Sequence, residues 1–567
     1  MSYARNAILT LTMIIGLAAH AATARLTGHV PSAQIAQATD LGRAVKTDMM
    51  RLVVPLKVND QTALKSFVDH VSSPSDLLYG RFLSQSEFTS LFAPSQSDYD
   101  SVAQTLTQLG FQVTAKHPNR LLIEVQAPVA TVEAALQTEI HQYQDKNGKL
   151  AHAPTLEPVV DAQLAAKIQG IVGLSSFTSR HKHIRHVKPQ DTDPVGFTPP
   201  GIRQAYGLTN MTQTGAGQTV ALVEFDGFLM SDITAFAAQY GLGTPNVQTV
   251  LIDGFNGVPS TGSDSGSDEV TLDIEMIMAL APQAKIVVYE ASPTSSDADV
   301  LALLNKIATD NSASTISNSW GSPENQMVAA TMQSENTIFM QFASQGQTSF
   351  VASGDDGAYD DGKTLSVDDP GSQPYSVDVG GTTLTVNGDG SYKSEIAWGS
   401  GSGPSAASTS GGSGGGISSV WQQPSFQNGL STTTNMGSTS MRMVPDVALN
   451  ADPNTGYECY FQGQLQDFGG GTSFASPLWA AFAALVNEQR SATGQSPLGY
   501  ALPLIYQIGQ GSNYTTVFHD ITGGTNLYYP ATAGYDLATG WGSFSGADLF
   551  TAMTSNSSAP NWLPSWW

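Results

Sequence analysis

Residues 469–488 read GGGTSFASPLWAAFAALVNE, a glycine-rich turn followed by an apolar run. The glycines permit close backbone approach, and the nearly all-apolar run that starts at Phe474 predicts a buried helix. Ser473 would then face the free N–H groups and the positive dipole end of that helix, a position that suits the binding of an oxyanion. The alternative is that Ser473 is the N-cap of the helix.

Histidine is scarce in the same part of the chain. All but one of the 10 histidines precede residue 190, which leaves His519 as the imidazole that could take a proton from a serine nucleophile. Residues 191–567 also hold 7 Lys and Arg against 34 Asp and Glu. A carboxylate is therefore the best candidate for the general base. So acidic a surface repels nucleic acid and anionic membranes, and it suits a protein that works in acid, although acidic secreted or halophilic proteins share this composition.

The first 24 residues have the pattern of an export signal. Arg5 precedes an apolar run at residues 7–19, and small residues that fit cleavage after Ala21 or Ala24 follow it. The run is too short to span a bilayer, so we expect a secreted or periplasmic protein. Because Cys459 is the sole cysteine, no internal disulfide can form, and stability must come from core size, with metal as a further possibility.

Residues 25–178 have an α+β pattern and form the predicted prodomain. A strand at 51–58, helices at 64–71, 84–92, 98–109 and 129–140, a hairpin across 111–125 and a second hairpin closed at 145–148 predict a ferredoxin-like split βαβ unit. Residues 179–196 form a basic segment that contains Pro189. Such a segment is typical of a solvated linker, and between two domains it is also where a removable propeptide would be cut.

Residues 197–555 alternate between strand and helix patterns. Strands are predicted at 219–225, 285–291, 314–320 and 349–353, with helices at 233–240, 269–280 and 299–308. This alternation indicates a doubly wound parallel sheet of the α/β class, whose sites lie beyond the carboxyl ends of the strands. Glu224, Trp320 and Asp355 fall at such ends.

A pair of acidic residues occupies the predicted helix at 269–280. Glu269 and Asp273 are four residues apart, so they share one helix face in an otherwise apolar segment. Two carboxylates this close do not both ionise when desolvated, so the pair would hold a proton in mild acid and could act as a general base with its orienting partner. The alternative is that Asp268 and Glu269 complement the helix dipole behind a Ser267 cap, which explains Asp273 poorly.

Together these segments resemble the sedolisin family of serine-carboxyl peptidases, most closely its kumamolisin-like members. The resemblance runs from about residue 50 to 550 and includes YGRFLSQSEF at 79–88, FTPPGIRQAYG at 197–207 and VPDVA at 444–448. It implies a subtilisin-like catalytic domain behind an activation prodomain that acts as an intramolecular inhibitor. The implied function is a self-processing, acid-active endopeptidase that cuts proteins or peptides.

The resemblance also implies roles for individual residues. Ser473 would be the nucleophile, Glu269 the general base and later acid, and Asp273 the residue that orients it and shares its proton. Asp355, in SGDDG at 353–357, looks like the carboxyl group that donates a hydrogen bond to the oxyanion when protonated. Its neighbour Asp356 leaves that assignment ambiguous, and the alternative for both is an Asp-Asp-Gly turn.

Two further features follow from the same resemblance. Glu224 and Trp320 resemble an outer hydrogen-bonding extension of the site, although Trp320 could equally pack or line a subsite. One structural Ca²⁺ is implied near the C-terminus, since Ca²⁺ prefers carboxylate and carbonyl oxygens in tight loops. Its implied ligands are the side chains of Asp520 and Asp536 and the carbonyls of Ile521, Thr532 and Gly534. His519 is expected to pack beside this site, and the tail at 556–567 stays unassigned.

Two other functions stay open on the sequence alone. A true subtilase would use His519 as its base and be active at alkaline pH. A calcium-stabilised binding module could have kept the fold without catalysis, which is disfavoured because Ser473, Glu269, Asp273 and Asp355 are all present. We expect a monomer that binds neither nucleic acid nor membrane.

Overall fold

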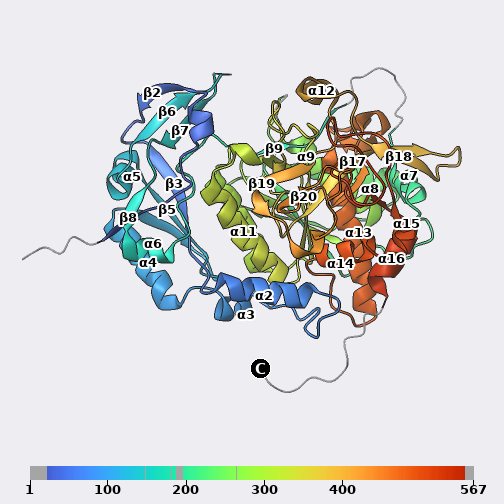
Figure 1. Cartoon of the computed structure of the whole chain (residues 1–567), viewed down its shortest axis with the longest axis horizontal. Coiled ribbons are helices and arrows are strands. Elements are labelled where there is room, and N and C mark those ends of the chain that lie inside the picture. The colour runs from blue at the N-terminus through green and yellow to red at the C-terminus, as the bar shows by residue number, and fades with distance from the viewer. Residues whose placement is uncertain (1–21, 147, 179, 187–195, 263–264, 556–567) are drawn as a thin grey trace, which may run out of the picture.

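The computed structural model describes residues 22–146, 148–178, 180–186, 196–262 and 265–555. Residues up to about 178 form a smaller lobe beside a larger one (Figure 1). Residues 1–21, 187–195 and 556–567 lie outside the described part, so the predicted signal segment, part of the linker and the tail stay predictions. The strand β1 (Thr23–Arg25) pairs with β8 (Val159–Asp161), so the folded lobe includes residues that cleavage after Ala24 would remove.

The smaller lobe has the predicted split βαβ order. Its central antiparallel sheet runs β3-β5-β4, and a bridge between Val53 and Val172 extends the free side of β3. A second sheet runs β2-β6-β7. The elements are β2 (Thr39–Arg43), β3 (Met49–Pro55), α2 (Gln61–Ser72), α3 (Gln85–Leu91), α4 (Gln96–Gln108), β4 (Gln112–Lys116), β5 (Leu122–Pro128), α5 (Val129–Leu136), β6 (Ile140–Gln144), β7 (Leu150–Pro154) and α6 (Ala162–Lys167).

The start of α3 shows how the sequence sets a helix boundary. The hydroxyl of Ser84 accepts a hydrogen bond from the backbone N–H of Glu87, and the Glu87 carboxylate accepts one from the N–H of Ser84. This reciprocal capping box satisfies two N–H groups that the first helical turn leaves unpaired. The predicted helix at 84–92 is therefore confirmed.

The larger lobe is built on a mostly parallel sheet with the order β11-β12-β10-β13-β15-β17-β18, and β21 also pairs with β17. Only β18 is antiparallel to its neighbour. The strands are β10 (Thr219–Glu224), β11 (Val247–Leu251), β12 (Lys285–Glu290), β13 (Thr315–Asn318), β15 (Thr348–Ala352), β17 (Val377–Val386), β18 (Tyr392–Ala397) and β21 (Val447–Asn450). The chain passes from β10 to β12 on one side and returns to β13 on the other, which makes the carboxyl end of β10 a switch point where doubly wound sheets bind ligands.

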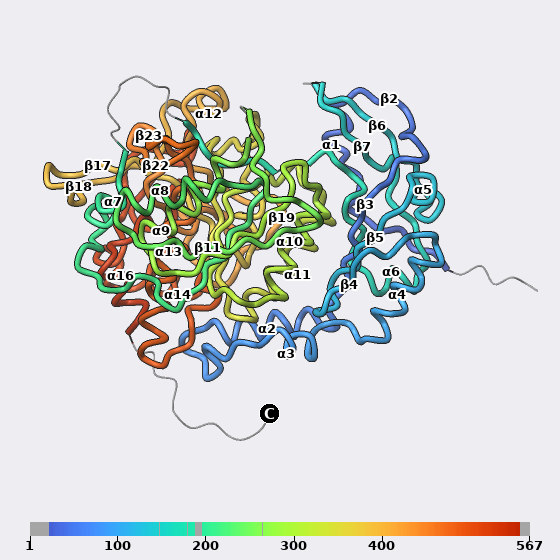
Figure 2. The backbone as a smooth tube through the Cα atoms, turned by 180° about the vertical axis from the view of Figure 1, so that it is seen from behind, coloured from blue at the N-terminus to red at the C-terminus, as the bar shows by residue number. Residues whose placement is uncertain are grey.

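Helices cover both faces of this sheet, as predicted. On one face α9 packs against α13, which also lies on β13, β15 and β17. On the other face α10 and α11 lie toward the smaller lobe (Figures 1 and 2). These helices are α8 (Met230–Tyr240), α9 (Ser267–Leu280), α10 (Asp297–Asp310), α11 (Ala329–Ser344) and α13 (Thr472–Ala492). Within the described ranges, no helix combines the length and apolar character needed to cross a membrane.

The smaller lobe docks on the larger one through buried and partly buried polar contacts, most of them with α10 and α11. Its helices α2 and α3 run along one edge of the larger lobe (Figures 1 and 2). Asn119 donates to the side chains of Asn305 at 2.6 Å and Gln341 at 2.9 Å. Arg51 donates to Asp299 at 2.7 Å and also pairs with Asp253. These contacts fix the two lobes in one orientation, which brings the linker to the carboxyl ends of the strands.

Candidate active site

Ser473 is the second residue of α13, and its position excludes a capping role. The helix begins at Thr472, and its N-cap is Gly471, which makes no side-chain capping bond. The Ser473 side chain is buried, and among the described residues its hydroxyl has no hydrogen-bond partner. The alternative that Ser473 is the N-cap is therefore wrong. Its hydroxyl is unengaged, and it lies where the first N–H groups of a helix have no partner within the helix.

Gly471 leaves room for two oxygens beside the serine. Its φ of 129° lies in the region that favours glycine. A Cβ at this position would stand 2.2 Å from the carbonyl oxygen of His183 and 2.8 Å from Oδ2 of Asp355. Both oxygens therefore approach the backbone just before Ser473, and a larger residue at position 471 would push them away.

The acidic pair of α9 lies next to Ser473 because α9 packs on α13. Glu269 and Asp273 are both fully buried. Burial raises the pKa of Glu269 well above its usual range, Asp273 raises it further, and the nearby Ser473 hydroxyl opposes the rise. Neither oxygen of Glu269 has a hydrogen-bond partner within the described residues. Glu269 and Ser473 are therefore neighbours with no formed hydrogen bond between them, as is common for catalytic pairs outside the reacting complex.

A chain of carboxyl groups continues inward from Asp273. Burial raises the pKa of Asp273, and the neighbouring Glu224 raises it further. Glu224 ends β10, is fully buried, and has a raised pKa for the same reason. Nε1 of Trp320 donates to Glu224 at 2.9 Å, and the indole also packs edge-on against Phe225. Carboxyl groups so close together and so far from water share protons. Trp320 therefore donates a hydrogen bond to this network and also packs against Phe225.

Ser319 belongs to the same network and was missed in the sequence. Its hydroxyl lies 2.9 and 3.0 Å from the two oxygens of Asp273, to which it donates. This bond opposes the rise in the pKa of Asp273 and fixes the orientation of its carboxyl group. The available signal was its place immediately after β13, at the carboxyl end of a central strand.

Asp355 and Asp356 have different surroundings. Oδ1 of Asp355 accepts from the N–H of Thr472 at 2.8 Å and from its hydroxyl at 3.0 Å, whereas Oδ2 has no partner among the described residues. Burial raises the pKa of Asp355 to about 6, although His183 and Arg185 act to lower it. Asp356 instead accepts from Arg185 at 2.6 Å. Because Asp355 bonds to the residue beside Ser473, a local turn does not account for it.

The described part of the linker, residues 180–186, runs through this site. Its strand β9 (His181–Lys182) pairs antiparallel with β14 (Trp320–Pro323). The N–H of Ser473 donates to the carbonyl oxygen of His183 at 3.2 Å, and Arg185 exchanges backbone hydrogen bonds of 2.8 and 3.0 Å with Gly470. The peptide carbonyl of His183 therefore lies at the backbone N–H of the serine, with chain bound on both sides of it.

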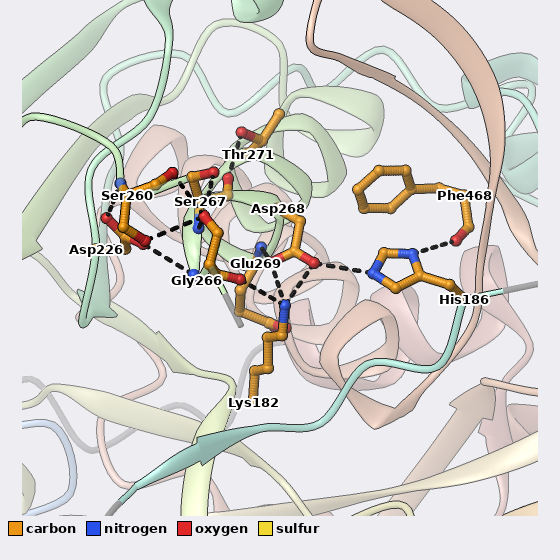
Figure 3. Close-up of polar contacts among 11 residues, drawn as sticks. Lys182, His186, Asp226, Ser260, Gly266, Ser267, Asp268, Glu269, Thr271 and Phe468 are labelled. Carbon is orange, nitrogen blue, oxygen red and sulfur yellow. Dashed lines mark hydrogen bonds and ion pairs between the residues drawn. The ribbon is translucent and has the colours of Figure 1, made fainter. Parts of the chain in front are cut away.

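Asp268 contacts the linker at two points (Figure 3). The ammonium group of Lys182 lies 2.5 Å from both carboxylate oxygens, and Nε2 of His186 lies 2.9 Å from one of them. Ser267 does not cap α9, because the N-cap is Gly266 and makes no side-chain capping bond. The Ser267 cap, which was part of the alternative interpretation of this helix, is therefore wrong. The Gly266 N–H donates instead to Asp226 at 2.8 Å.

The residues expected to bind calcium lie close together in two loops. Oδ1 of Asp520 accepts from the N–H of Gly534 at 3.0 Å, which ties the loops to each other. Burial raises the pKa of Asp536 to about 7. Within the described residues no donor reaches the carbonyl oxygens of Ile521, Thr532 or Gly534. The carboxylate of Asp536 accepts hydrogen bonds from the N–H groups of Thr532, Ala538 and Thr539, so an ion would share it with these donors. Two carboxylates and three carbonyls offer oxygen ligands only, the donor type that Ca²⁺ prefers.

His519 lies apart from Ser473. It stacks on Tyr392 with 3.6 Å between ring centroids, and its Nδ1 lies 3.0 Å from the hydroxyl of Ser543. Burial lowers the pKa of His519 to about 4. These contacts involve none of the residues around Ser473, so the geometry gives no support to His519 as a general base.

A serine at the start of a buried helix, a carboxyl pair beside it and a doubly wound parallel sheet define a serine peptidase of the subtilisin-like class. Residues 36–177 match the family described as Pro-kumamolisin, activation domain, and residues 260–497 match the Subtilase family. The smaller lobe is therefore an activation prodomain.

Individual relatives identify the family. Sedolisin of Pseudomonas sp. (strain 101) is 32% identical over 89% of this chain and 87% of its own length. Kumamolisin of Bacillus sp. (strain MN-32) is 32% identical over 94% of this chain and 96% of its own. The solved structure of Pseudomonas sedolisin, a serine-carboxyl proteinase complexed with two molecules of pseudo-iodotyrostatin, has a TM-score of 0.57 and 31% identity, and the match covers 65% of this chain and 100% of that one. The chain belongs to the sedolisin family of serine-carboxyl peptidases, and it is a self-processing peptide hydrolase.

The environment of Asp355 predicts the alkaline limit of activity. A protonated Asp355 can donate from Oδ2, so activity should fall as the pH rises through the pKa of Asp355. That pKa is about 6 while His183 and Arg185 of the linker lie beside it, and it should be higher once they have left, because both lower it. Asp355→Ala should lose roughly 10² to 10³ in kcat, the usual effect of removing one oxyanion donor. Asp355→Asn donates at any pH, so it should keep partial activity with its alkaline limit moved upward.

The measurement is kcat/KM against pH, with melting controls, on variants matured by tagged wild type that is then removed. Asp389→Asn serves as the control, because Asp389 is exposed and bonds only within its own loop. If Asp355→Ala follows the wild-type profile, Asp355 does not donate to the oxyanion.

Proposed function

We propose that Ser473 is the nucleophile of this peptidase and Glu269 its general base. The observation that carries this is the adjacency of two buried groups, the Ser473 hydroxyl and the Glu269 carboxyl, neither of which has another hydrogen-bond partner in the described part of the chain. Oγ of Ser473 attacks the substrate carbonyl carbon while its proton passes to Glu269. Asp273, held by Ser319, shares that proton, and Glu224 with Trp320 extends the network.

The developing oxyanion would be bound by two donors. One is the N–H of Ser473, which donates to the His183 carbonyl oxygen in the zymogen. The other is protonated Asp355, whose Oδ2 approaches the same backbone. Glu269 then returns its proton to the departing amine, which leaves an acyl group on Ser473, and water releases that group by the same steps in reverse. Because Asp355 must be protonated, this mechanism supports activity in acid.

The path of the linker supports cleavage within chains rather than at their ends. Residues before His183 pair with β14, and Arg185 after it pairs with Gly470. The cleft therefore accepts peptide on both sides of the attacked carbonyl. The same contacts support a role for the linker as the cut segment, and they point to the bond between His183 and Ile184. Until that cut, the linker fills the cleft, and the docked prodomain acts as an intramolecular inhibitor.

Calcium, export and oligomeric state complete the proposal. The oxygen-only donor set of Asp520, Asp536 and three carbonyls would hold one structural Ca²⁺. The positive charge of the ion would offset the cost of burying the Asp536 carboxylate.

Residues 1–24, with their apolar run, support a secreted or periplasmic location. The acidic C-terminal part supports a monomer that acts on proteins or peptides and binds neither nucleic acid nor membrane.

Processing at the linker is tested by following the zymogen in acid. Wild type incubated at about pH 4 should lose mass and yield a product that begins at Ile184, whereas Ser473→Ala should stay full length, because it lacks the nucleophile. Intact-mass spectrometry and N-terminal sequencing report both results. Cleavage of highly purified Ser473→Ala at the same bond would contradict the assignment of the nucleophile, and a wild-type product that begins elsewhere would contradict the assignment of the bond.

The calcium site is tested by thermal melting. A ligand that binds only the folded state stabilises it by RT ln(1 + [L]/Kd), so EGTA at about pH 5 should lower the melting temperature of wild type. Asp520→Ala should melt at the lower temperature and no longer respond to EGTA. A melting temperature that is indifferent to the chelator, in wild type and variant alike, would exclude the site.

A further inference from the structure

Asp268 stands at the entrance to the carboxyl network but is not part of it. It is the second residue of α9, directly before Glu269, and only 6% of it is exposed. The proton transfer described above does not use it. Asp268 instead faces outward to the linker, where Lys182 lies one residue before the attacked carbonyl of His183 and His186 lies three residues after it.

The contacts of Lys182 form a built pocket for an ammonium group. Its Nζ lies 2.5 Å from each oxygen of Asp268 and donates at 2.7 Å to the carbonyl oxygen of Ser265. Three oxygens thus surround one cation. The backbone of this pocket is fixed by Asp226, which accepts from the N–H groups of Gly266 and Ser260 at 2.8 Å (Figure 3). A preorganised pocket of this kind distinguishes a charged side chain from a neutral one.

The same carboxylate also holds the other side of the attacked bond. Nε2 of His186 lies 2.9 Å from Oδ2 of Asp268, and Nδ1 of His186 lies 3.1 Å from the carbonyl oxygen of Phe468. Asp268 therefore contacts the peptide both before and after the bond between His183 and Ile184. Two contacts that flank one peptide bond fix its place relative to Ser473.

The pKa of Asp268 depends on the cations of the bound linker. Burial alone would raise the pKa of Asp268, but His186 and Lys182 outweigh it, and the pKa lies below its usual value. Glu269, the next residue, has a raised pKa. Ionisation of Asp268 and binding of a basic side chain at the position of Lys182 therefore favour each other.

We propose that Asp268 is a specificity-determining residue, which selects a basic side chain immediately before the residue whose carbonyl is attacked and clamps the linker across its cut bond. This rests on the proposed function of Ser473 and Glu269. A substrate with Lys or Arg at that position would reproduce the contacts of Lys182, and a neutral side chain would take the ammonium group away from the buried carboxylate of Asp268 and leave it with His186 and the N–H of Glu269.

The proposal is tested with paired quenched peptides on matured enzyme at about pH 4. One peptide has the sequence of residues 180–186, RHKHIRH, and the other has norleucine in place of Lys182. Wild type should prefer the lysine peptide by at least about tenfold in kcat/KM, as expected for a buried charge pair. Asp268→Asn should lose that preference. Taking the ratio of the two peptides removes any effect of the substitution on the base Glu269.

Asp389→Asn is the matched control and should keep the wild-type ratio. A lysine preference that is equal in wild type and Asp268→Asn would overturn the proposal. If wild type cuts neither peptide, the proposed catalytic function fails, and the clamp is then judged by a measurement that needs no catalysis.

That measurement is hydrogen exchange in the full-length Ser473→Ala chain. Adding Asp268→Asn should speed amide exchange in residues 181–186 by about tenfold or more, because the linker loses two side-chain contacts. Adding Asp389→Asn should leave exchange unchanged. Equal linker protection in the two double variants would refute the clamp, whatever the peptides show.

Discussion

The burial of carboxyl groups without cations beside Ser473 is the constraint on which the rest of this molecule depends. Glu224, Asp273 and Glu269 are fully buried where α9 meets α13 and β10. Removing a charge from water is costly, so each group has a raised pKa and the network holds protons. A proton-sharing carboxyl can accept the serine proton in acid, where an imidazole would be charged and unable to do so.

The linker supplies the cations that this region otherwise lacks. Arg180 pairs with Glu335 and Asp369, Lys182 with Asp268, and Arg185 with Asp356. The basic segment therefore pairs with buried acidic side chains while it fills the cleft. In the zymogen one segment thus both blocks the site and compensates the negative charge around it. At Asp268 the contacts with Lys182 and His186 outweigh burial and the pKa is lowered. At Glu335 and Asp356 burial outweighs the linker cation, and at Glu224 no linker cation is in contact, so the pKa values of these three acids are raised.

Much of the fold could be predicted because parallel strands buried on both faces are continuous apolar runs, as in β10 and β12. Glu269 and Asp273 could be paired from their spacing, and Ser473 stood out after its glycines. The roles of Asp268 and the route of the linker could not be found, because each depends on contacts between segments far apart in sequence. Ser319 was missed, although its place after β13 was an available signal. The linker's basic residues were interpreted as a solvated linker or the place where a propeptide is cut, without their contacts in the site. The caps at Ser267 and Ser473 were wrong because glycines take those positions.

Infrared spectroscopy of the carboxyl groups tests the central claim most directly. Protonated carboxyl groups absorb apart from carboxylates, so a difference spectrum between the full-length Ser473→Ala chain and the same chain with Asp273→Asn reports whether Asp273 holds the proton of this network and leaves Glu269 free to accept one. At about pH 6, well above the pKa of an exposed aspartic acid, the account predicts loss of a protonated carboxyl band in the Asp273→Asn chain and no loss in a matched Asp389→Asn chain. A difference spectrum that shows only a lost carboxylate would contradict the account.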